Sequence, residues 1–115
     1  MRVRVRKYER VAIVTFDIKT KKFKSRYEIN KFFRGLYGWK QTVPSHDKKY
    51  CYHRQGILDQ VPYAKIADSV LLVTLKHLQD VLNYLRQWEE KIDYEIINMM
   101  MEKRKLMKML GGLHD

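Results

Sequence analysis

The chain has little of what marks disulfide-stapled or membrane-spanning proteins. Its 115 residues include one cysteine, two prolines and five glycines. The lone Cys51 excludes an internal disulfide and fits a reducing compartment. No apolar run approaches the roughly 20 residues of a membrane helix, and the N-terminus has no apolar core for a signal peptide. We therefore expect a single cytoplasmic domain with no membrane partner.

Acidic residues are scarce in the first third of the chain. The net charge is +11, and residues 1–40 hold 13 Lys or Arg against 3 acids, whereas residues 76–115 hold 7 of each. Such a concentrated excess is typical of a surface that binds a polyanion, most often nucleic acid. The alternative is a lysine-rich surface with no such partner.

Residues 11–18 (VAIVTFDI) form the clearest predicted strand. Both of its alternating faces are apolar, so we expect a central strand covered on both sides. The strand delivers Asp17 to its own end. A helix should follow, because Ser25 and Glu28 have capping-box spacing, apolar residues recur at helical spacing from Ile29 to Tyr37, and Gly38 can end the helix.

The rest of the chain repeats this order. Residues 39–43 read as a short strand that residues 44–47 break, and residues 48–61 as an extended arm or hairpin as far as Gly56. A second central strand is expected within residues 68–76, followed by an amphipathic helix and an edge strand over residues 92–96. The order is typical of an α+β, ferredoxin-like split βαβ fold with both helices on one face of the sheet.

The C-terminal third allows two interpretations. We expect a break before a Met-rich helix over residues 97–110, but no Gly or Pro excludes a single helix over residues 76–110. The first interpretation divides one domain into a basic N-terminal arm or edge strand (1–10), a core (11–98) and a Met-rich C-terminal helix (99–115).

Residues 11–43 resemble a known family. Phe16-Asp17-Ile18 at a strand end, Arg26, Leu36-Tyr37-Gly38 and Gln41-Thr42-Val43 are similar to the small CRISPR-associated endonuclease and spacer-integration subunit, CRISPR-associated protein two, and to a related domain of phenylacetate-operon repressors. The resemblance implies a homodimer in which two strand-end aspartates face each other and hold Mg²⁺ or Mn²⁺. It would make Asp17 the catalytic metal ligand of an endonuclease and Arg26 a phosphate contact. A vaguer similarity is to hairpin-plus-helix DNA-binding modules.

Asp17 needs a second acid for metal work, which we expect from a dimer because this part of the chain offers only one. Its alternative role is a cap at the strand end. His46, Cys51 and His53 match no standard zinc spacing. The Met-rich stretch is read as a packing face or dimer contact.

Nucleic-acid binding, to DNA or RNA, is the leading interpretation. The rivals are a non-enzymatic transcriptional or architectural DNA-binding protein and a protein-interaction domain. Tyr27 and Trp39 are candidates for stacking on unpaired bases. The predicted phosphate-contacting residues are Lys19, Lys21, Lys22, Lys24, Arg26, Lys31, Arg34 and Lys40.

Overall fold

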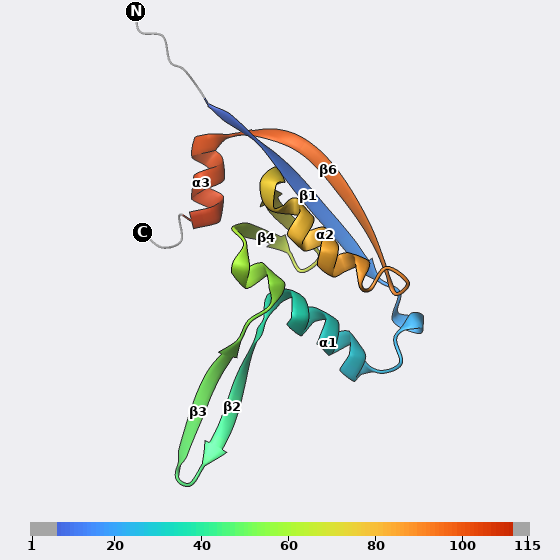
Figure 1. Cartoon of the computed structure of the whole chain (residues 1–115), viewed down its shortest axis with the longest axis vertical. Coiled ribbons are helices and arrows are strands. Elements are labelled where there is room, and N and C mark those ends of the chain that lie inside the picture. The colour runs from blue at the N-terminus through green and yellow to red at the C-terminus, as the bar shows by residue number, and fades with distance from the viewer. Residues whose placement is uncertain (1–6, 112–115) are drawn as a thin grey trace, which may run out of the picture.

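Nine helices and strands follow one another in the computed structural model, which describes residues 7–111 (Figure 1). In chain order they are β1 (Tyr8–Ile18), α1 (Arg26–Tyr37), β2 (Trp39–Ser45), β3 (Lys48–Arg54), β4 (Tyr63–Ala67), β5 (Val70–Thr74), α2 (Leu78–Arg86), β6 (Ile92–Glu102) and α3 (Lys103–Gly111). The protein is therefore an α+β protein, as the sequence predicts. Residues 1–6 of the predicted basic arm or edge strand lie outside the described residues, whereas residues 8–10 are the first residues of β1.

The main sheet is antiparallel, in the order β4-β5-β1-β6. β1 is central, and Ile13 lies opposite Leu72 of β5 and Ile97 of β6. The two predicted central strands, of residues 11–18 and 68–76, are thus confirmed, and they are neighbours. Their apolar sequences fit this position because central strands are buried on both faces.

Helices α1 and α2 pack on the same face of the sheet, as predicted. Val14 and Phe16 of β1 share one buried cluster with Phe32 of α1 and Leu85 of α2. The rings of Phe16 and Phe32 meet edge to face at 5.7 Å, an arrangement that aromatic pairs favour. This cluster is the core of the protein.

The opposite face of the sheet is covered at one end by α3. Leu106 is fully buried there against Val11 and Leu72. This contact explains why Val11 is buried on the side of β1 that faces away from α1 and α2. Among the described residues, no helix is long and apolar enough to cross a membrane.

One predicted strand belongs elsewhere. Residues 39–43 do not join the main sheet, because β2 pairs only with β3 in a separate two-stranded hairpin. The place expected for them in the main sheet is taken by β4, which pairs with β5. Of the two forms expected for the segment before Gly56, an extended arm or a hairpin, the structure has a hairpin, and its first strand is the one that the sequence placed in the main sheet.

The boundary of the C-terminal helix also differs from the prediction. Strand β6 continues to Glu102, so Met99, Met100 and Met101 lie in a strand and the helix begins only at Lys103. Pairing of β6 with β1 along its whole length outweighs the helical spacing of the methionines. The break after α2 is confirmed, and the alternative of one helix over residues 76–110 is wrong.

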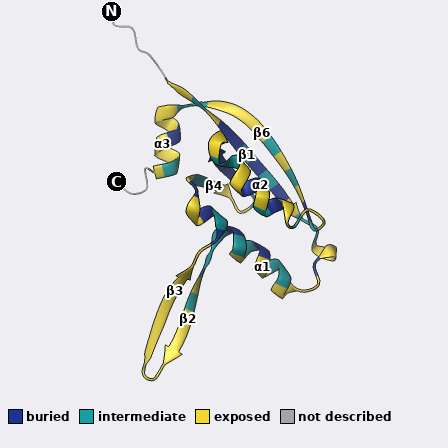
Figure 2. Cartoon of the chain, in the orientation of Figure 1, coloured by how far each residue is buried: buried dark blue, intermediate teal, exposed yellow. Residues whose placement is uncertain are grey.

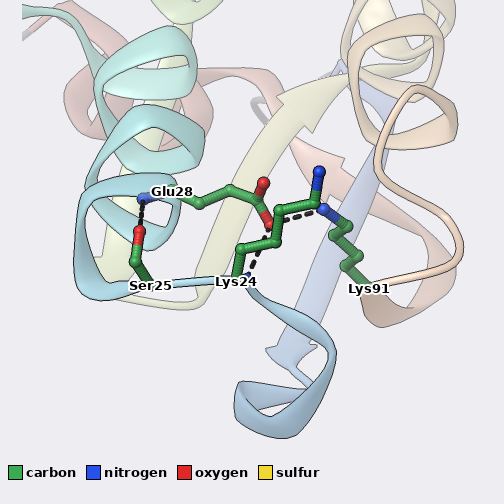
Figure 3. A network of polar contacts seen from close by, with 4 residues as sticks. All are labelled: Lys24, Ser25, Glu28 and Lys91. Atoms are coloured by element: carbon green, nitrogen blue, oxygen red, sulfur yellow. Dashed lines mark hydrogen bonds and ion pairs between the residues drawn. The ribbon is translucent and has the colours of Figure 1, made fainter.

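The N-terminus of α1 is fixed by the predicted cap and by a contact from a distant segment (Figure 3). The Ser25 hydroxyl accepts a hydrogen bond from the Glu28 amide at 3.3 Å, and the Glu28 carboxylate accepts one from the Lys24 amide at 3.1 Å. Lys91, just before β6, also donates to this carboxylate. The Lys91 hydrogen bond, and then the Lys24 amide, hold the pKa of Glu28 below its usual value.

Candidate functional site

The β2–β3 hairpin projects from the core into solvent (Figure 1). Every residue of β3 is exposed, and within β2 only Trp39 and Gln41 are partly buried (Figure 2). The hairpin therefore contributes almost nothing to the core. Its exposed side chains are therefore available to bind a ligand.

One face of the hairpin is rich in aromatic and basic side chains. The register pairs Trp39 with Arg54, Gln41 with Tyr52 and Val43 with Tyr50, and paired residues two positions apart share a face. Tyr50 and Tyr52 are each 47% exposed. The Arg54 guanidinium lies 5.6 Å from the Tyr52 ring centroid and donates a hydrogen bond to the Gln41 side chain at 2.6 Å. The rings and the cations are thus held beside one another.

This face continues onto the outer side of α1. Tyr27, Lys31 and Arg34 are spaced so that they lie on one side of the helix, and they line a hollow of about 260 Å³ together with Trp39. The Arg34 guanidinium lies over the Trp39 ring at 4.4 Å, and Tyr27 is 73% exposed. We call the combined surface the aromatic–basic face. It consists of Tyr27, Lys31, Arg34, Trp39, Lys48, Tyr50, Tyr52 and Arg54.

The base of the hairpin is anchored by Asp59. Its carboxylate accepts a hydrogen bond from the Gly56 amide at 2.7 Å and contacts His53 Nε2 at 2.9 Å. Partial desolvation raises the pKa of Asp59, but the Gly56 amide and His53 outweigh it and hold this pKa below its usual value. An ionised Asp59 therefore ties the returning strand to the turn that follows it.

The predicted basic residues are divided among several surfaces. Lys31 and Arg34 belong to the aromatic–basic face, whereas the register puts Lys40 on the opposite face of the hairpin. Lys19 forms an ion pair with Asp93 at 3.3 Å, and this pairing partly neutralises the charge of Lys19. The others precede or begin α1 and are exposed: Lys21, Lys22, Lys24 and Arg26.

Four residues of the aromatic–basic face were missed as site residues by reasoning from the sequence. Lys48, Tyr50, Tyr52 and Arg54 all lie in β3, for which the sequence predicts only an extended arm or hairpin. The signal in the sequence was the spacing of Tyr50 and Tyr52, which are two residues apart as on one face of a strand. In the structure they lie opposite Val43 and Gln41. That alternation predicts a strand but not which residues lie opposite one another.

Asp17 has an acidic neighbour from its own chain, contrary to the expectation that a dimer would be needed. It lies directly opposite Asp93 of β6, and both border one hollow with Glu95. No hydrogen bond or ion pair within residues 7–111 involves the Asp17 side chain, so the expected cap at the strand end is not seen. Within the same residues, no three His, Cys, Asp or Glu side chains are placed to hold a metal ion.

The weak zinc candidates are separated by the hairpin. His46 lies at its tip with a positive φ of 55°, whereas His53 lies near the base against Asp59. Cys51 is exposed in between and lies 3.8 Å from the Thr42 hydroxyl. This arrangement does not bring the three side chains together.

In comparisons with known proteins, no family model, no curated protein and no solved structure matches this chain. The resemblance of residues 11–43 to the family of CRISPR-associated protein two stays a prediction. The function is therefore inferred from the side chains of the aromatic–basic face.

Proposed function

We propose that this protein binds single-stranded or unpaired nucleic acid, DNA or RNA, through the aromatic–basic face. The observation that carries the proposal is a row of rings beside fixed cations, from the partly buried Trp39 to the exposed Tyr52 and Tyr50, on a hairpin that projects into solvent. Aromatic rings stack on unpaired bases whatever their sequence, and basic side chains neutralise the phosphates between them. Such binding needs aromatic rings and basic side chains beside one another, and the aromatic–basic face provides both.

Packing within the protein does not account for these rings. An isolated two-stranded hairpin is only marginally stable in water, and this one lies against no other sheet. Tyr50 and Tyr52 remain nearly half exposed, so much of their apolar surface is left in water. A ligand that covers the rings would bury that surface and stabilise the hairpin at once.

The aromatic rings favour unpaired bases over a duplex. A two-stranded ribbon also fits the major groove of duplex DNA, where it meets the edges of the bases. Rings stack on the faces of bases, which a duplex hides within its own stack. The face therefore suits a single strand, a loop or an end.

We also infer a ferredoxin-like domain into which the hairpin is inserted after α1. The order β4-β5-β1-β6 supports this, because β1-α1-β4 and β5-α2-β6 then form two interleaved split βαβ units. The exposed free thiol of Cys51 supports a reducing compartment such as the cytoplasm. The fold alone does not carry the function.

Metal-dependent cleavage at Asp17 is the second candidate. The observation in its favour is that Asp17 lies opposite Asp93, since like charges in such a pair repel each other and Mg²⁺ or Mn²⁺ would relieve the part of this repulsion that the Lys19–Asp93 ion pair leaves. A wild-type protein that leaves a labelled oligonucleotide intact with either ion present would remove this candidate, and Asp17→Asn is the matched variant if cleavage occurs.

The proposed binding is tested by fluorescence anisotropy with a labelled oligonucleotide and the duplex of the same sequence. We expect tighter binding of the single strand. If Lys31, Arg34, Lys48 and Arg54 each neutralise one phosphate, log affinity should fall against log salt with a slope of about −3. A flat salt response, or equal affinity for the duplex, would contradict the proposal.

A further inference from the structure

The β2–β3 hairpin has a second face, on the side away from the aromatic rings. Because side chains alternate along a strand, the residues between those of the aromatic–basic face point the other way. A contact of 3.8 Å between the Thr42 hydroxyl and the Cys51 thiol joins two of them across the strands. We call this surface the lysine face. It consists of Lys40, Thr42, Pro44, Lys49, Cys51 and His53.

The lysine face is basic but has no large ring on which a base could stack. All six of its residues are exposed, and none is Tyr, Trp or Phe. Within residues 7–111, no ion pair or hydrogen bond occupies the ammonium group of Lys40 or Lys49. The hairpin as a whole has four basic residues against one acid, Asp47 at its tip. The lysine face therefore offers two free cations to phosphates.

A strand that is stacked along the aromatic–basic face does not reach these two cations. Side chains on opposite faces of a two-stranded ribbon point away from each other, with the backbone between them. The hairpin lies against no other sheet and is exposed on both faces toward its tip (Figure 2). Each face is therefore open to a different strand at the same time.

We propose that the hairpin binds at a fork, where a nucleic acid duplex opens into two unpaired strands, with one strand on each face. Bases of one strand stack on Tyr50 and Tyr52, and Lys40 and Lys49 neutralise phosphates of the other. The hairpin projects from the core, so it can enter between the strands (Figure 1). This inference rests on the proposed binding of unpaired nucleic acid and adds the second strand.

A fork suits two such faces better than two separate strands do. Its strands are joined through the duplex, so once one strand is bound the other is held beside the hairpin. The second contact is then intramolecular, and it adds affinity without a second encounter. Each face alone needs only the groups that it has.

The test compares three labelled DNA probes by fluorescence anisotropy: a duplex with two unpaired tails, the same duplex with one tail, and that tail as a single strand. We expect the fork to bind at least about fivefold more tightly than either other probe, which exceeds the gain of about twofold from having two tails. Its log affinity should also fall against log salt more steeply than that of the single strand, by about 1.5 units, because two more phosphates are neutralised.

The variant Lys40→Gln/Lys49→Gln should remove both the preference for the fork and the extra salt slope. Its affinity for the single strand should stay within about threefold of the wild type, because the aromatic–basic face is unchanged. The matched control is Lys103→Gln/Lys105→Gln, which makes the same change of net charge on exposed residues of α3, at the other end of the molecule from the hairpin (Figure 1). This control should keep the preference for the fork.

The outcomes separate this inference from the proposed function. Binding of the single strand with no preference for the fork would overturn the inference and leave the proposed function standing. A preference that persists in Lys40→Gln/Lys49→Gln, or that disappears equally in the α3 control, would also overturn it, because the lysine face would then not be its source. A protein that binds none of the three probes would contradict both.

Discussion

Replacing Tyr50 and Tyr52 together by alanine is expected to weaken the binding of a single-stranded oligonucleotide by about 30-fold or more. Stacking of one base on an aromatic ring is worth about 1 to 3 kcal/mol, and two rings are lost. Both rings lie on the same face of the hairpin and are equally exposed. Fluorescence anisotropy at fixed salt measures the loss.

Two controls separate stacking from a general effect of the changes. Tyr50→Phe/Tyr52→Phe keeps both rings and should bind within a few-fold of the wild type, because stacking needs the ring and not the hydroxyl. Tyr8→Ala removes a tyrosine of similar exposure, 53%, from β1 and should leave binding unchanged. Equal losses in all three variants would show that these tyrosines do not stack on bases.

The change Gly56→Ala is expected to destabilise the protein by about 3 kcal/mol, the upper end of the usual cost of overpacking. The chain leaves α1 at Gly38 and returns at Gly56, and the two backbones touch there. A Cβ built on Gly56 would lie 2.2 Å from the Gly38 amide nitrogen and 2.6 Å from the Leu36 carbonyl oxygen. These are backbone atoms next to the buried Leu36, so they cannot move aside as the end of a flexible side chain can.

Thermal unfolding measures this effect. A loss of 3 kcal/mol should lower Tm by roughly 10 °C or more in a protein of this size. The matched control is Gly111→Ala, because a Cβ there meets no atom within 4 Å, and its stability should stay within about 0.5 kcal/mol of the wild type. Similar Tm values for Gly56→Ala and Gly111→Ala would contradict the close approach at the hairpin base.

The core of the fold was predictable because its signals are local. The nearly continuous apolar run over residues 11–18 identifies β1, and the spacing of Ser25 and Glu28 identifies the start of α1. The end of β6 was not predictable from such signals, because Met99 to Met101 suit either a strand or a helix. Pairing with β1, a contact distant in sequence, decides between them.

The candidate site was predictable only in part for the same reason. The excess of basic residues in the first third predicts Lys31 and Arg34 as phosphate contacts, and both lie on the aromatic–basic face. The hairpin half of this face depends on the pairing of β2 with β3 and on its separation from the main sheet. The neighbour of Asp17 depends likewise on pairing with β6, and Asp93 lies far from it in the sequence. The spacing of residues within one segment does not show which distant segment it pairs with.

Fluorescence of Trp39 tests the central claim most directly. The chain has two tryptophans, and Trp88 is stacked on Phe23 in the core at 5.8 Å, so the Trp88→Phe variant leaves Trp39 as the only reporter. Bases that stack along the aromatic–basic face should quench or shift its emission, with saturation at the oligonucleotide concentration that saturates anisotropy. Saturable binding of the single strand without any change in Trp39 emission would contradict the account.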